Sequence, residues 1–140
     1  METTIFYFSA TGNSLSLSRN LANELGNCEV VSIAKAIQNN TVNVNSAKVG
    51  FIFPVYAWGM PRIVEEFIQK IQIPNDCYVF AIVTCVAIPG NTLKDLKRLL
   101  HTKGIQLQAG YVTKAGRSSL MKLNSLDKMI MLLDTRRGKI

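Results

Sequence analysis

The chain has 140 residues, of which 48% are hydrophobic and 18% are charged, and its formal net charge is +7. This length suits one domain with a sizeable core, and the composition excludes a disordered chain. We expect neither a membrane-spanning helix nor a secretory signal, because there is no apolar run of about eighteen residues and no basic segment before an apolar one.

Three cysteines, Cys28, Cys77 and Cys85, lie far apart in the sequence. They match neither a disulfide framework nor a Cys-x-x-Cys metal or iron–sulfur motif, so we expect reduced thiols and a cytoplasmic location. The positive charge is compatible with acidic protein partners, nucleic acid or anionic ligands, and charge alone does not choose among them.

The first half of the chain alternates strand and helix patterns. Residues 5–8 are apolar at every position, as expected for a central parallel strand that is buried on both faces. Leucines four residues apart predict a helix over 14–25, and Gly26 ends it. The later elements expected in this half are a strand over 28–33, a weak helix over 32–38, an asparagine-rich loop, and a strand over 48–53 that Pro54 closes.

The second half continues the alternation. Pro61 is expected at the first position of an amphipathic helix that reaches residue 71, and residues 78–84 form the most apolar strand. The next helix is capped by Asn91 or Thr92 and ends at Gly104. Its cations Lys97, Arg98 and Lys103 are expected near its negative C-terminal end, and an edge strand follows over 105–112.

Five strands joined by helices, with no hairpin signal, predict an α/β fold with a doubly wound parallel sheet. We expect one domain over 1–140. Its last segment, 115–140, has apolar residues on one helical face and a basic end. The segment is expected to form a fifth helix that covers the sheet, and the alternative is a basic amphipathic helix for a partner or a membrane.

Polar and aromatic residues follow the first, third and fourth predicted strands. In such a sheet, ligands bind outside the carboxyl ends of the strands, so these loops are expected to share one site. The first loop offers hydroxyl and amide donors before a helix, with no Lys or Arg in the turn, which predicts a phosphate held by neutral dipoles. The second loop carries the only Trp, which predicts a flat aromatic group stacked nearby.

The segment 8–14, Phe-Ser-Ala-Thr-Gly-Asn-Ser, resembles the FMN phosphate loop of flavodoxins, Ser/Thr-x-Thr-Gly-Asn-Thr/Ser. The segment 53–61 further resembles the flavin loop in the flavodoxin half of fused flavodoxin–ferredoxin proteins. The likeness covers roughly residues 3–114. It implies a three-layer fold with strand order 2-1-3-4-5, non-covalent binding of FMN, and electron transfer through the flavin ring.

The resemblance also implies a role for each loop. The FMN phosphate would be held by Ser9, Ala10, Thr11, Gly12, Asn13 and Ser14. The ring would be lined by Pro54, Val55, Tyr56, Ala57, Trp58 and Gly59, with Tyr56 or Trp58 stacked on it. The pyrimidine edge would be reached by backbone groups of Thr84, Cys85 and Val86. Fused relatives commonly have a glycine pair where this chain has Val86 and Ala87, and the clustered ferredoxin cysteines are absent.

Simpler explanations exist for the same residues. The Thr-Gly-Asn-Ser turn alone is compatible with a helix cap, Tyr56 and Trp58 with a cover over the core, and Cys85 with an inert buried thiol. We expect His101 to be solvated or to interact with the helix dipole. Nucleic-acid binding through the basic tail is disfavoured, because the tail has no recognised motif and no interleaved aromatic residues.

The function favoured by these patterns is electron transfer to a redox protein, such as an acidic ferredoxin-type partner. The alternatives are a flavin-dependent quinone or NAD(P)H oxidoreductase, and a cofactor-free module that binds an acidic partner. The sequence predicts no metal site. P-loop NTPase, dinucleotide-binding and Gly-x-Ser-x-Gly hydrolase motifs are all missing from the sequence.

Overall fold

The computed structural model describes residues 2–9, 12–55, 59–85 and 90–114. The expected helix at 115–140 lies outside these residues, so that helix and the single domain over 1–140 stay predictions. In chain order the elements are β1 (Thr3–Tyr7), α1 (Asn13–Leu25), β2 (Cys28–Ser32), α2 (Ile33–Ala36), β3 (Val42–Asn43), β4 (Lys48–Pro54), α3 (Arg62–Lys70), β5 (Ile71–Gln72), β6 (Tyr78–Cys85), α4 (Thr92–Thr102) and β7 (Leu107–Lys114).

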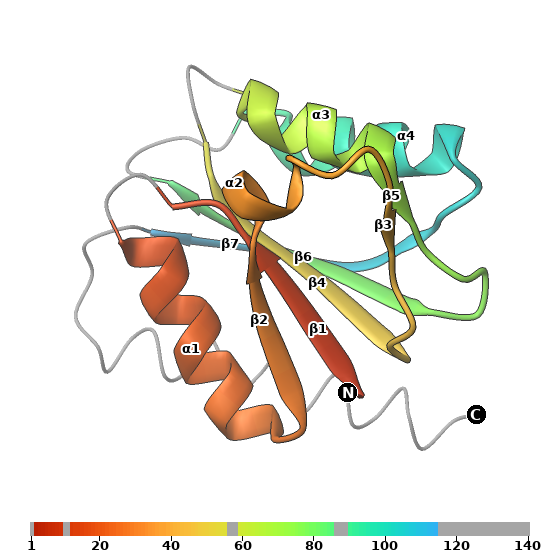
Figure 1. Cartoon of the computed structure of the whole chain (residues 1–140). Coiled ribbons are helices and arrows are strands. Elements are labelled where there is room, and N and C mark those ends of the chain that lie inside the picture. The colour runs from red at the N-terminus through yellow and green to blue at the C-terminus, as the bar shows by residue number, and fades with distance from the viewer. Residues whose placement is uncertain (1, 10–11, 56–58, 86–89, 115–140) are drawn as a thin grey trace.

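The main sheet contains five parallel strands in the order β2-β1-β4-β6-β7 (Figure 1). The central strand β4 is buried from Lys48 to Phe53, and β6 is buried from Val79 to Cys85. Such continuous burial explains why these two strands are apolar at successive positions and do not alternate with polar ones. The α/β class and the parallel five-stranded sheet are as the sequence predicted.

The predicted strand order 2-1-3-4-5 is corrected to 2-1-4-6-7, because two short strands enter the count. β3 and β5 have two residues each and pair with each other in a separate parallel sheet, through Val42 with Ile71 and Asn43 with Gln72. Two residues are too few to produce a period-two pattern, so neither segment is recognisable as a strand from the sequence.

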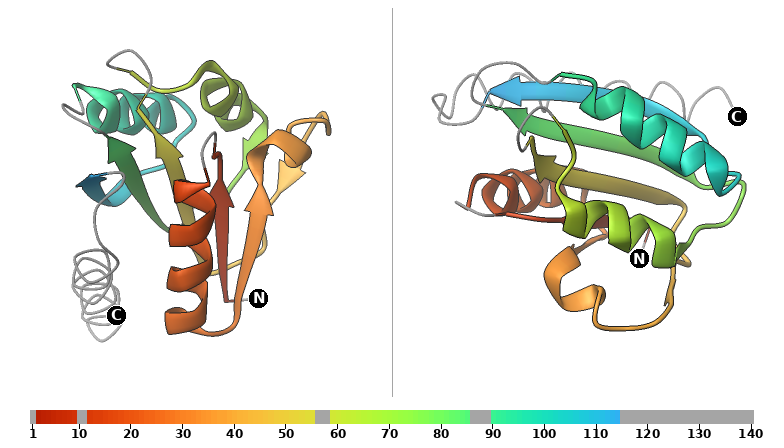
Figure 2. Two further views of the ribbon diagram at one scale, coloured as in Figure 1. Left: turned by 90° about the vertical axis from the view of Figure 1, so that its left-hand side faces the viewer. Right: turned by 90° about the horizontal axis from the view of Figure 1, so that it is seen from above.

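Helices cover both faces of the main sheet (Figure 2). On one face, Leu17 and Leu21 of α1 pack with Ile5, Ile52 and Phe80 of the strands. The other face is covered by α2, α3 and α4, whose buried residues include Ile33, Val64, Phe67, Ile68, Leu96 and Leu100. Alternate residues of β4 enter these two clusters, so both faces of the strand are covered by side chains from helices.

Some element boundaries differ from the predicted ones. β1 begins at Thr3, two residues before the apolar run, and the Thr4 and Ser46 hydroxyls are hydrogen-bonded to each other in the interior. Pro61 is the residue before α3 and not its first helical residue. Asn91 occupies the capping position of α4 without a side-chain cap bond, and Thr92 is the first helical residue.

Lys103 stabilises the end of a neighbouring helix. It follows α4, and its amine donates to the carbonyl oxygens of Ile68 at 2.8 Å, Gln69 at 2.9 Å and Ile71 at 2.5 Å. These carbonyls end α3, where a positive charge is favourable. Lys103 lies at the C-terminal end of α4, as the sequence predicted, and in addition its amine binds the end of α3. Burial lowers the pKa of Lys103 from its usual value.

We predict that Lys103→Met lowers the free energy of unfolding by about 1–2 kcal/mol, because three carbonyl oxygens lose a charged donor. The control is Lys97→Met on the exposed side of α4, which is expected to change stability by less than about 0.5 kcal/mol. Urea denaturation of both variants measures this difference, and equal midpoints for the two would contradict it.

Gly50 lets two strands of the core pack closely. A Cβ atom at position 50 would lie 2.2 Å from Cζ and 2.3 Å from Cε2 of the Phe80 ring. Phe80 is fully buried, so its ring has little room to move away. The aromatic ring fills the space above a residue without a side chain, and glycine is required at this place for steric reasons.

We predict that Gly50→Ala destabilises the fold by about 2 kcal/mol or more, through overpacking against Phe80. Gly110→Ala is the matched control, because a Cβ atom there would lie 3.2 Å from the terminal methyl groups of Leu93, which have more freedom to adjust. Thermal unfolding compares the two variants. Phe80→Leu in the Gly50→Ala background should recover part of the loss, and a merely additive loss would argue against the proposed clash.

Candidate functional site

The carboxyl ends of β1, β4 and β6 are linked side by side by backbone hydrogen bonds. The Phe8 amide donates to the Ile52 carbonyl at 2.9 Å, and the Val55 amide donates to the Thr84 carbonyl at 2.9 Å. Pro54 is paired with Thr84 in the sheet. The segments that follow these strands therefore leave from one edge of the sheet, which is where a doubly wound fold binds ligands.

The turn after β1 is closed by a side chain. The Gly12 amide donates to Oγ of Ser9 at 2.8 Å, and the Gly12 carbonyl accepts the first helical bond, from the Ser16 amide at 3.0 Å. Because the Ser9 oxygen already accepts a hydrogen bond, its own hydrogen is directed elsewhere and is available to an acceptor. The turn therefore orients a hydroxyl donor beside the start of α1.

Gly12 adopts a left-handed conformation, with φ of 89°, and it is exposed. Among the described residues other than its chain neighbours, no atom would lie within 4 Å of a Cβ atom at this position, so the backbone angle is the reason that favours glycine here. These residues leave room for a ligand group to approach the Gly12 backbone closely.

The N-terminus of α1 is suited to an anion. Its first turn contains no acidic residue, and the first amides of any α-helix have no acceptor inside the helix itself. The helix dipole adds a partial positive charge at this end. Of the predicted phosphate ligands, Ser14 is buried, with 1% of its surface exposed, and Asn13 is half-buried.

The other predicted site residues divide into two groups. Val55 and Thr84 are joined at the edge by their hydrogen bond, Pro54 and Gly59 are half-buried, and Cys85 is 4% exposed. Predicted site residues that lie outside the described part of the chain are Ala10, Thr11, Tyr56, Ala57, Trp58 and Val86. The expected stacking by Tyr56 or Trp58, and a phosphate contact from Thr11, therefore stay predictions.

The three cysteines are free thiols. Burial raises the pKa of Cys77 to about 11, with a smaller contribution from Asp76, and burial together with Glu29 raises that of Cys28 to about 11. Both groups are therefore protonated at neutral pH and are poor nucleophiles. Among the described residues, no cluster of His, Cys, Asp and Glu is suited to hold a metal ion.

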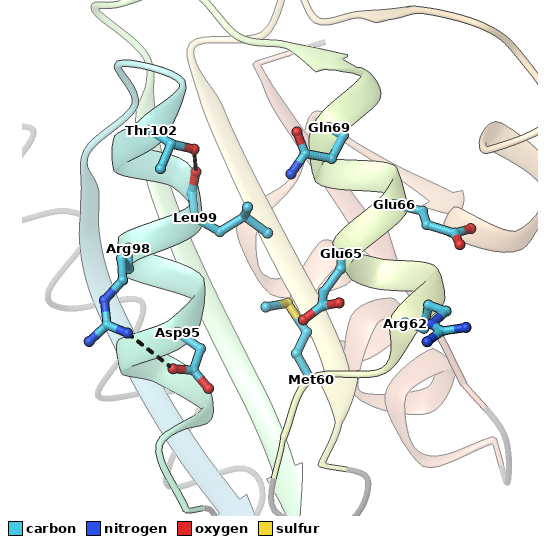
Figure 3. A pocket seen from close by; sticks show the side chains of 9 residues that line it. All are labelled: Met60, Arg62, Glu65, Glu66, Gln69, Asp95, Arg98, Leu99 and Thr102. Carbon is cyan, nitrogen blue, oxygen red and sulfur yellow. Dashed lines mark hydrogen bonds and ion pairs between the residues drawn. The ribbon is translucent and has the colours of Figure 1, made fainter.

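Two cavities are lined by described residues other than the predicted site residues. One is a groove of about 600 Å³ between α3 and α4, with Met60 and Leu99 among its lining residues (Figure 3). The other, of about 530 Å³, lies between β1, β2 and the loop that precedes β4. Neither cavity is predictable from the sequence, because the lining residues come from elements far apart in the chain.

The comparisons with known proteins agree with this architecture. A family model described as a flavodoxin domain matches residues 4–136. The chain belongs to the flavodoxin family. A search of curated protein sequences found no significant match. None of the helices in the described part of this flavodoxin-family chain is long and apolar enough to span a membrane.

Several solved structures share its fold. The chain is similar to a putative flavoprotein from Bacteroides uniformis, with 16% identity, a TM-score of 0.68, and coverage of 90% of this chain and 97% of that one. It is similar to a flavodoxin from Streptococcus pneumoniae TIGR4, with 13% identity, a TM-score of 0.68, and coverage of 96% and 98%. General stress protein 14 of Treponema denticola, solved in complex with FMN, has 8% identity, a TM-score of 0.70, and coverage of 96% and 99%.

We predict that Gly12→Ala destabilises the turn of this flavodoxin by about 1 kcal/mol or more, because a side chain disfavours the left-handed conformation. Gly12→Asn is the matched variant, since asparagine tolerates that conformation better than alanine. Chemical denaturation should rank wild type above Gly12→Asn and Gly12→Asn above Gly12→Ala. An alanine variant as stable as the asparagine variant would contradict the backbone explanation.

Proposed function

We propose that this chain binds FMN at the carboxyl edge of β1, β4 and β6 and carries electrons between redox proteins. The observation that carries the proposal is the turn between β1 and α1. There Ser9 and the left-handed Gly12 set a hydroxyl group beside the start of a helix whose first turn has no acidic residue, and no described residue beyond its chain neighbours crowds Gly12. The FMN complex of the Treponema denticola relative supports the choice of ligand.

The described residues fit the phosphate end of this cofactor. Amides at the start of α1 and the Ser9 hydroxyl are neutral donors, and no Lys or Arg occurs between Phe8 and Ser18. Neutral donors in a fixed turn bind a phosphate without a mobile counter-charge. This suits a phosphate that only anchors the cofactor, in contrast to one that is transferred.

The opposite end of the site is proposed from the sequence. Tyr56 or Trp58 would stack on the ring, and backbone groups of Thr84, Cys85 and Val86 would contact its pyrimidine edge. When bound, FMN would supply the redox chemistry, while the protein would set its position and exclude water from one face. The backbone bond between Val55 and Thr84 supports this arrangement by holding the two loop origins together.

The proposal extends to the location, the partner and the domain organisation of the protein. We propose a cytoplasmic location, which the three free thiols support. The likeness of residues 53–61 to fused flavodoxin–ferredoxin proteins supports a ferredoxin-type partner. The family match through residue 136 supports one domain that includes the C-terminal segment.

We predict that added FMN binds the purified chain with quenching of flavin fluorescence. Thr11→Ala should weaken binding about tenfold or more, because a hydroxyl bond to a charged phosphate is lost. Trp58→Ala should also weaken binding about tenfold, through lost stacking area. Thr41→Ala, in the exposed loop before β3, is the control and should bind as wild type does.

Failure of the wild-type chain to quench FMN would overturn the proposal and favour the cofactor-free module. If FMN binds, steady-state assays with a nicotinamide or a quinone, without a protein partner, separate a carrier from an oxidoreductase. A carrier should show only slow turnover with these small molecules. Rapid turnover would instead assign the chain to the flavin-dependent oxidoreductases.

A further inference from the structure

The outward face of α4 carries a row of basic side chains. The row consists of Lys94, Lys97, Arg98 and His101, and all four are exposed. Their spacing of three and four residues places them on one side of the helix. The opposite side, with Leu96 and Leu100, is fully buried in the core.

This row differs from the outward faces of α1 and α3. Exposed residues of α1 are Ser16, Arg19, Asn20, Asn23 and Glu24, and those of α3 are Arg62, Glu65, Glu66 and Gln69. Both sets are mixed in charge. In α4, Asp95 lies 3.9 Å from Arg98, and the two side chains are 45% and 77% exposed. An exposed pair at this distance neutralises little of the row.

The N-terminal end of the row opposes the stability of α4. Lys94 lies in the first turn, where the helix dipole disfavours a cation. The spacing also places Lys94 near Lys97 and Arg98, which are like charges on neighbouring turns. Helix stability therefore does not explain why these cations share one face, whereas an anionic partner at this face would offset their repulsion.

The row begins close to the proposed FMN site. α4 starts at Thr92, after the connection that leaves the carboxyl end of β6. Beside the row lies the groove between α3 and α4, where Met60 and Leu99 offer apolar contact area (Figure 3). A partner that covers the row and this groove would lie next to the carboxyl edge of the sheet.

We infer that the basic row of α4 and the adjoining groove form the docking surface for an acidic electron-carrier protein. This inference rests on the proposed function, because it assigns the partner of the same site. Complementary charge would guide the partner to the surface, and the groove would supply short-range contacts.

The α3 side of the groove favours a protein partner over a polyanion such as nucleic acid. Glu65 and Glu66 of α3 are exposed beside the groove and would repel a nucleic-acid backbone or an anionic membrane. A folded protein can present acidic residues to α4 and basic or neutral residues to α3. The basic side chains on α4 and the acidic side chains on α3 therefore match a partner protein that carries acidic and basic residues at separate positions on its surface.

The test is calorimetric titration of the full-length chain with an acidic [2Fe–2S] ferredoxin at low and high salt. The double variant Lys94→Gln with Lys97→Gln should raise Kd about tenfold at low salt and flatten the salt dependence, since two contacts with the anionic partner are lost. The charge-matched control, Arg19→Gln with Lys35→Gln on α1 and α2, should change Kd less than about twofold.

A second measurement separates docking from a structural role. The Lys94→Gln, Lys97→Gln variant should unfold at a temperature equal to or above that of wild type, because it removes like-charge repulsion. Weakened ferredoxin binding together with a lowered unfolding temperature would overturn the inference. Equal weakening by the control variant would also overturn it, since net charge alone would then explain the attraction.

Two further binding titrations, one with lipid vesicles and one with DNA, identify the class of partner. Vesicles of anionic lipid and a short DNA duplex should bind more weakly than ferredoxin, and tighter binding through Lys94 and Lys97 would overturn the inference. The FMN titration is scored separately. If the chain binds FMN but its ferredoxin binding does not depend on Lys94 and Lys97, only the docking surface is rejected. If ferredoxin binding depends on these lysines but the chain does not bind FMN, the flavin function is rejected and the docking surface is kept.

Discussion

Two backbone hydrogen bonds hold the carboxyl edge of the sheet together, and the proposed site depends on them. They join Phe8 to Ile52 and Val55 to Thr84, at the points where β1, β4 and β6 end. Parallel strands in register deliver their following loops to one edge, so residues more than seventy positions apart in the chain leave the sheet side by side. At this edge, the Ser9 side chain and the left-handed Gly12 form the turn that leads into α1.

The core that supports this edge is specified by shape as well as by hydrophobicity. Phe6 lies between Phe51 and Phe67, with ring centroids 6.1 and 5.0 Å away, on the face covered by α3. On the opposite face the Phe80 ring occupies the space that Gly50 leaves free. In this pair of neighbouring strands, a large side chain of β6 packs over a small residue of β4.

The cations of this chain have separate physical roles. Lys103 and Lys70 use their amines to bind backbone carbonyls of other segments, which is a structural role. Lys94 and Lys97 are exposed on one face of α4 and are available to a partner. Residues 1–114 contain ten Lys or Arg and seven Asp or Glu, a balance of +3, so residues 115–140 contribute +4 of the total +7. Net charge therefore says little about any one surface, because the position of each cation decides its role.

The sequence by itself determined the α/β class, the five long parallel strands and the family, because buried strands and the Ser-x-Thr-Gly-Asn-Ser turn are local patterns along the chain. It also placed Ser9 and Gly12 in one turn. Tertiary structure alone decided the pairing of β3 with β5, the contact between Gly50 and Phe80, and the capping of α3 by Lys103. Each of these contacts joins residues about thirty positions apart. The residue spacing within one helix or strand does not predict which distant side chain will fill a space in the core or bind a carbonyl at a helix end.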